Sequence, residues 1–88
     1  MKKAPEEIES ELRKFIISEF LPDEDEEDLT SDIELINTGI LDSISVISIV
    51  AHLESTYNFK VDAHEASLEN MNTIESMRKL VLNKIAAT

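Results

Sequence analysis

Asp42 and Ser43 are the residues of this sequence whose types and position best suit chemistry. They follow a turn, residues 37–41, that contains the only glycine of the chain, and an apolar pattern with helical spacing begins at Ile44. A serine in the first turn of a helix has an exposed hydroxyl beside backbone N–H groups that lack helical partners. The positive end of the helix dipole also favours a phosphate there. We therefore predict that Ser43 is a site of covalent attachment rather than a catalytic nucleophile.

The histidines do not complete a catalytic or metal site with this serine. Ser43 and His52 lie more than two turns apart on one expected helix and point in opposed directions, so a hydrolytic triad has poor geometry. The chain has no cysteine that would join His52 and His64 in a metal site. We interpret His52 as a surface residue of the helix and His64 as a loop residue.

An acidic run, residues 23–28, is a second candidate site. Its carboxylates, extended to Glu34, follow the alternate spacing of an EF-hand loop, and a helix is expected before them. However, Asp28 stands at the sixth position, where the sharp turn requires glycine, and no regular helix is expected after Glu34. A divalent-ion-binding module therefore remains an alternative function, and no residue is assigned as a metal ligand.

Length and charge restrict the fold and the partners. The 88 residues indicate one domain, residues 1–88, and at this size only roughly 60–65% of the unfolded chain's surface can be buried. The net charge is −11, and residues 15–59 contain eleven acidic side chains and no Lys or Arg. Such a field repels nucleic acid and anionic membranes and attracts basic proteins. It also opposes self-association, so we expect a monomer.

Neither end of the chain nor its interior predicts a membrane segment. No apolar run approaches the roughly 20 residues that cross a bilayer. Residues 1–7 lack the apolar segment of a signal peptide. We expect a cytoplasmic protein.

The hydrophobic periodicity predicts an all-α fold of three main helices and one short one. The helices are expected at residues 5–21, from Ser43 to about Tyr57 with Asp42 as N-cap, at residues 68–71, and from about residue 74 onward. Asn72 and Glu75 have the spacing of a capping box before the last helix. Residues 29–41 form a long loop that apolar side chains anchor to the core.

The second helix is unusually apolar. Seven of the ten residues 44–53 are apolar, whereas Ser45, Ser48, His52 and Ser55 form one narrow polar stripe. A helix of this kind is a central core helix, or it lines a crevice for an apolar cargo or docks on partners. Core placement is expected for most of these residues.

Residues 39–44 (Gly-Ile-Leu-Asp-Ser-Ile), 50–54 and 57–61 resemble the acyl carrier protein family, and residues 69–74 are similar to the start of its last helix. The resemblance implies a four-helix bundle with a long first loop. It implies that Ser43 carries 4′-phosphopantetheine, transferred from coenzyme A by a magnesium-dependent phosphopantetheinyl transferase. Asp42 matches the family's acidic neighbour, which helps present the serine.

The function that the resemblance implies is that of a carrier without catalysis of its own. Acyl or aminoacyl groups would be held as thioesters and delivered to loading and processing enzymes with basic patches, in fatty acid, polyketide or related specialised biosynthesis. The Gly-Ile-Leu-Asp-Ser spelling is more similar to D-alanyl carrier proteins than to fatty acid carriers, and the neutral stripe indicates a dedicated partner set. A non-covalent acidic helical adaptor is the alternative from a different class.

Overall fold

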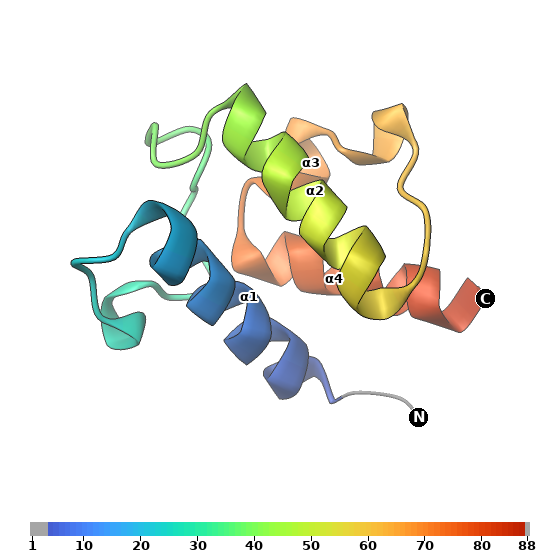
Figure 1. Cartoon of the computed structure of the whole chain (residues 1–88), viewed down its shortest axis with the longest axis horizontal. Coiled ribbons are helices and arrows are strands. Elements are labelled where there is room, and N and C mark those ends of the chain that lie inside the picture. Colours follow the sequence, from blue (N-terminus) through green and yellow to red (C-terminus); the bar gives the residue numbers. More distant parts are fainter. Residues whose placement is uncertain (1–3, 88) are drawn as a thin grey trace.

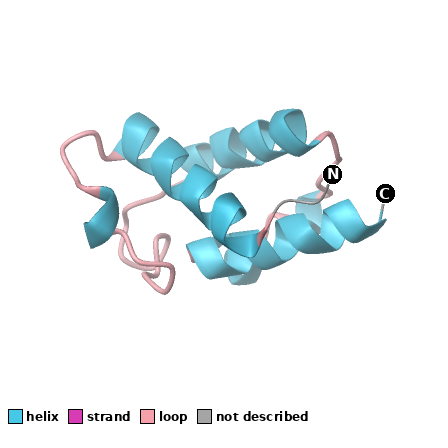
Figure 2. Ribbon diagram, turned by 90° about the horizontal axis from the view of Figure 1, so that it is seen from below, coloured by secondary structure: helices cyan, strands magenta, loops and turns pink. Residues whose placement is uncertain are grey.

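The computed structural model describes residues 4–87, in which every regular element is a helix (Figures 1 and 2). Residues 1–3 and residue 88 lie outside the described residues. The expectation about a signal peptide concerns residues 1–7 and therefore falls partly outside them. The α-helices are α1 (Pro5–Phe20), α2 (Ser43–Tyr57), α3 (Leu68–Met71) and α4 (Ile74–Ala87), and the 3-10 turns are η1 (Glu26–Asp28) and η2 (Ala63–Glu65). The predicted all-α bundle of acyl-carrier type, with three main helices, one short helix and a long first loop, is confirmed.

One hydrophobic core joins all four helices and the long loop. α1 and α3 both pack against α4, and α2 crosses over them (Figure 1). Apolar side chains at helical spacing supply this core, because a stripe of such residues must be buried against a neighbour. The fully buried side chains are Ile8, Leu12, Ile16, Leu35, Leu41, Ile49, Leu53, Met71, Ile74, Met77 and Val81.

The helix ends follow local signals. Pro5 occupies the start of α1, where its missing N–H costs no hydrogen bond, and Glu6 and Glu7 lie in the first turn, where the helix dipole favours acids. α1 ends at Phe20, one residue earlier than predicted. At the end of α2, Asn58 adopts a left-handed conformation with φ of 58° and donates its N–H to the Glu54 carbonyl at 3.0 Å.

Asn72 anchors the long loop to the junction of α3 and α4. Its carbonyl oxygen accepts the N–H of Leu35 at 2.6 Å, and its Oδ1 accepts the N–H groups of Ile36 at 2.9 Å and Asn37 at 3.2 Å. The predicted Asn72 capping box is therefore wrong. Thr73 caps α4 instead, since its Oγ1 accepts the Ser76 N–H at 3.0 Å. The Asn72 side chain is already used by the loop.

A polar network fixes the start of the same loop. The Glu9 carboxylate accepts hydrogen bonds from Ser31 Oγ at 2.5 Å and from Arg78 Nη1 at 2.9 Å. Arg13 donates through Nε to the Leu29 carbonyl at 2.6 Å. These contacts join α1, the loop and α4, so both ends of the loop are fixed before the chain enters α2.

Candidate functional site

Asp42 and Ser43 lie where α2 begins. Asp42 is the N-cap, as predicted, and its Oδ1 accepts the N–H of Ser45 at 2.8 Å. Hydrogen bonds from the backbone N–H and the hydroxyl of Ser45 lower the pKa of the Asp42 carboxyl. The group is therefore ionised at neutral pH. Ser43 is the first helical residue and is exposed.

The turn before the site is built by Gly39. Its φ of 84° lies in the left-handed region that side chains disfavour. The Gly39 N–H donates to the Ile36 carbonyl at 3.0 Å, and the Leu41 N–H donates to the Leu35 carbonyl at 2.9 Å. The turn buries Leu41 in the core and leaves the next residues, Asp42 and Ser43, exposed.

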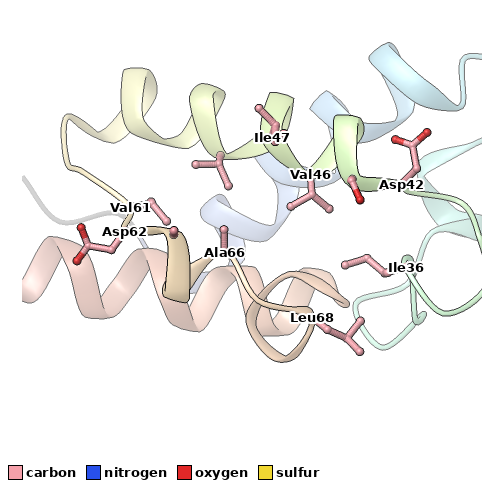
Figure 3. Close-up of a pocket in the computed structure, with 11 residues that line it drawn as sticks. Ile36, Asp42, Val46, Ile47, Val61, Asp62, Ala66 and Leu68 are labelled. Carbon is pink, nitrogen blue, oxygen red and sulfur yellow. The ribbon is translucent and has the colours of Figure 1, made fainter.

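A crevice of about 450 Å³ opens beside Ser43. One wall is α2, with Val46, Ile47 and Val50, and the other is the segment from Val61 to Leu68 (Figure 3). Asp42 lies at one end of the crevice and Asp62 at the other, whereas the side chains between them are mainly aliphatic (Figure 3). The volume falls within the roughly 300–1,000 Å³ of small-molecule sites.

The apolar residues of α2 are divided between core, crevice and solvent. Only Ile49 and Leu53 are fully buried, whereas Ile44 is 75% and Ile47 is 68% exposed. Leu68, across the crevice, is 51% exposed. Val46 and Val50 are partly buried and pack against the core. Core placement therefore explains most of the apolar residues, as expected, and the helix also lines a crevice and presents an apolar surface. We call Ile44, Ile47 and Leu68 the apolar rim.

His52 is more buried than we predicted for a residue of the exposed polar stripe. Its ring stacks on Phe15 of α1, with centroids 3.9 Å apart and planes at 10°. The stripe is otherwise confirmed in part, since Ser48 and Ser55 are exposed and Ser45 is half-buried. The Phe15 contact turns His52 toward α1, and no triad with Ser43 forms. His64 is exposed in η2.

Two residues that hold the crevice were not identified from the sequence. Glu54 accepts the Val61 N–H through Oε2 at 2.8 Å and so fixes the start of the segment that forms the second wall of the crevice. Asn72 fixes Ile36, which also lines the crevice. Both side chains act on residues distant in the sequence, and a polar residue at a helix end gives no signal of such a partner.

The acidic run does not adopt an EF-hand arrangement. Residues 26–28 form η1, and turns rather than a helix follow Glu34. Across residues 4–87, no three His, Asp or Glu side chains lie where they would hold a metal ion.

An all-α bundle with an exposed serine at a helix start, beside an aliphatic crevice, is the arrangement of a small carrier domain. The model of the family described as "Phosphopantetheine attachment site" matches residues 14–81. The chain belongs to this family, whose site takes covalently attached 4′-phosphopantetheine. Carrier proteins of this kind are in general not enzymes.

The chain is also similar to D-alanyl carrier proteins. Those of Streptococcus pyogenes serotype M5 (strain Manfredo), serotype M49 (strain NZ131) and serotype M1 are each 37% identical over 43 residues. The match covers 49% of this chain and 54% of each relative, so the chain spans about half the length of the curated relatives it matches. None of the helices described between residues 4 and 87 is long and apolar enough to cross a membrane.

Proposed function

We propose that the chain is a carrier protein, one domain over residues 1–88, in which Ser43 is the attachment point of 4′-phosphopantetheine. The carrier holds acyl or aminoacyl groups as thioesters and delivers them to partner enzymes. The observation that carries this proposal is the exposed Ser43 in the first turn of α2, among the residues that line the crevice.

The residues around Ser43 fit a phosphate ester and an arm attached to it. The start of a fifteen-residue helix favours an anion through its dipole and its unpaired N–H groups. The aliphatic crevice can cover part of an arm or its cargo from water. The attached group supplies a thiol, which this cysteine-free chain lacks. The chain itself anchors the arm, shields part of the cargo and presents the cargo to partner enzymes.

Asp42 has two roles in this proposal. As N-cap it fixes the start of α2, and hence the direction of the Ser43 side chain. The resemblance to acyl carriers also implies that it helps hold the magnesium ion of the transferase. The lowered pKa supports both roles, since each requires an ionised carboxylate.

The cargo is proposed from the relatives and from α2. The printed name of the similar proteins is "D-alanyl carrier protein", and we infer an aminoacyl cargo of this kind first, with a fatty acyl or polyketide cargo as the alternative. The exposed face of α2 supports a dedicated partner set, because Ser43 to Leu53 contain no Asp or Glu. The partners are a phosphopantetheinyl transferase and the enzymes that load and process the cargo.

Intact mass spectrometry tests the attachment site. The wild type is incubated with coenzyme A, magnesium and a broad-specificity phosphopantetheinyl transferase, beside Ser43→Ala and Ser48→Ala. Ser48 is the matched control, since it is an exposed serine of the same helix. We expect a gain of one phosphopantetheine in the wild type and in Ser48→Ala, and none in Ser43→Ala.

Two results would contradict the proposal. A gain in Ser43→Ala would move the attachment to another residue. No gain in any variant, with the cognate transferase as well, would favour the non-covalent acidic adaptor. Circular dichroism of each variant shows that the fold is retained, so a missing gain is not caused by unfolding.

A further inference from the structure

The second wall of the crevice, residues 61–68, is held in place by polar contacts more than by the core. No side chain from residue 60 to residue 70 is buried, and Val61 packs against the core only in part. The facing wall is different, because α2 is anchored by Ile49 and Leu53, which are fully buried. Burial of apolar side chains is the main force that fixes a segment in a fold. The position of the second wall therefore depends on other contacts.

Glu65 is the centre of these contacts. Its Oε1 accepts the N–H of Asp62 at 2.9 Å and the ammonium group of Lys84 at 2.7 Å. Its carbonyl oxygen accepts Asn70 Nδ2 at 2.9 Å. Asp62 lies in the second wall, Asn70 lies in α3 and Lys84 lies in the last turn of α4. One residue of η2 therefore ties the second wall to two helices.

The ion pair between Glu65 and Lys84 is more enclosed than an ordinary surface pair. The two side chains are 22% and 21% exposed, whereas those of Glu75 and Lys79, an ion pair within α4, are 49% and 63% exposed. Hydrogen bonds from Lys84 and from the Asp62 N–H lower the pKa of the Glu65 carboxyl. The pair is therefore charged at neutral pH, and a partly buried pair is screened by salt less than an exposed one.

Glu65 and its neighbours face different sides of the second wall. Ala63 and Ala66 line the crevice, and Ala66 points toward α2 (Figure 3). Glu65, between them, does not line the crevice and reaches Lys84 of α4 instead. The aliphatic surfaces on the two sides of the crevice gain free energy when they close on each other. An ion pair on the side of the wall away from the crevice opposes that closure.

We propose that Glu65 and Lys84 are positioning residues of the crevice, and that their ion pair holds the second wall on α4 so that the crevice stays open for an apolar chain. This chain is part of the arm or of its cargo. A site that is already formed before binding takes its ligand more tightly, because the bound arrangement does not have to be ordered first. The inference deepens the proposed function and rests on it, since it assumes a cargo carried from Ser43.

A purely structural role of Lys84 makes a different prediction. A cation in the last turn of a helix is favoured by the helix dipole. If Lys84 served only the end of α4, its replacement would lower stability and leave ligand binding in the crevice unchanged. Binding in the crevice is therefore the property that distinguishes the two roles.

Nuclear magnetic resonance of the full chain without an arm measures this binding. The probe is 1-octanol, a neutral aliphatic alcohol, and the methyl resonances of Val46 and Val50 report on the crevice. Lys84→Met removes the charge and keeps an unbranched apolar side chain, whereas Lys84→Arg keeps the charge. Lys79→Met is the matched control, because it breaks an ion pair of the same helix, with Glu75 at 3.2 Å, away from the second wall.

We expect saturable methyl shifts in the wild type and a Kd for 1-octanol that rises about 2- to 10-fold in Lys84→Met, as the loss of one partly buried ion pair allows. Lys84→Arg and Lys79→Met should change the Kd less than about 2-fold. An unchanged Kd in Lys84→Met would overturn the proposal, and so would an equal rise in Lys79→Met. Absence of saturable shifts in the wild type would overturn it as well.

A second variant and a local measurement keep the test independent of overall stability. Glu65→Gln removes the other charge of the pair but keeps an acceptor for the Asp62 N–H, so it should raise the Kd as Lys84→Met does. Hydrogen exchange of the Asp62 amide should become faster in Lys84→Met, whereas the Ile16 amide in the middle of the core should keep its relative protection. Equal acceleration at both amides would indicate general loosening and refute the positioning role.

Failure of the inference stays distinct from failure of the proposed function. The octanol titration uses the chain without an arm, so its result does not depend on attachment. Lys84→Met should gain one phosphopantetheine as the wild type does, because Ser43 lies in α2 and not in the second wall. An unchanged Kd together with a mass gain at Ser43 would refute the positioning role alone. No mass gain in the wild type would refute the proposed function, whatever the octanol result.

Discussion

Replacement of Asn72 by alanine should destabilise the protein through the loop that leads to Ser43. The change removes the Oδ1 acceptor of two N–H groups, those of Ile36 at 2.9 Å and Asn37 at 3.2 Å. The Ile36 bond is partly buried, whereas the Asn37 bond is exposed and water can replace it. The main loss is thus one partly buried donor left without its acceptor, which costs roughly 1–3 kcal/mol.

Urea unfolding measures this cost. For a domain of this size, a loss of about 2 kcal/mol lowers Tm by roughly 8–16 °C. Hydrogen exchange localises the effect, because the Ile36 and Asn37 amides should exchange faster while amides in the middle of α4 keep their relative protection. Shielding of a cargo in the crevice should also weaken, since Ile36 forms part of the crevice wall.

Two further variants make the Asn72 prediction refutable. Asn72→Asp keeps an acceptor oxygen for the two N–H groups, so it should lose less stability than Asn72→Ala. It should not reach wild-type stability, because it places a negative charge near Glu34. Asn37→Ala is the matched control, because that side chain donates only to Glu34 at an exposed position. The control should change stability by less than about 0.5 kcal/mol. Equal losses in Asn37→Ala and Asn72→Ala would refute the anchoring role.

Three other predictions concern the surface and the charge of the protein. Ile44→Ser and Ile47→Ser should each change the free energy of unfolding by less than about 0.5 kcal/mol, since both side chains are exposed, but should raise the KM of a partner enzyme. Burial and the hydrogen bond to Glu11 raise the pKa of Tyr57 above its usual 10.0. The unfolded state therefore releases this proton first, and stability falls as the pH rises above about 10. The fall should be less steep in Tyr57→Phe. Urea unfolding below and above this pH measures the loss of stability, and the absorbance of the single tyrosine reports its ionisation. Added salt should raise Tm, because it screens the repulsion within residues 15–59, and a Tm independent of ionic strength would contradict this.

Sequence reasoning succeeded where the signals are local. Asp42 as N-cap, the start of α2 at Ser43 and the short α3 all depend on residues within one turn of each other, and all three are confirmed. The exposure of Ser43 follows from its place in the first helical turn. A Gly-containing turn before a capping aspartate was sufficient to locate the candidate site.

The failures involve residues whose partners are distant in the sequence. Asn72 has the spacing of a cap for α4, yet its side chain binds Ile36, 36 positions away. His52 is half-buried rather than fully exposed, because its ring stacks on Phe15, a partner that the sequence does not indicate. Most apolar residues of α2 contact the core as expected, but the exposure of Ile44 and Ile47 could not be predicted, since periodicity does not distinguish a buried side chain from one on an exposed surface.

The two parts of the site, the Ser43 hydroxyl and the crevice, depend on contacts of different sequence range. The Ser43 hydroxyl is positioned by the Asp42 cap, a contact within one helix turn, so it should remain available even when the surrounding bundle is loosened. The crevice depends instead on long-range contacts, such as Glu54 with Val61 and Asn72 with Ile36. Attachment of the arm and shielding of its cargo therefore have different structural requirements. Substitutions at Glu54 or Asn72 should impair shielding before they prevent attachment, because only the crevice walls depend on those bonds.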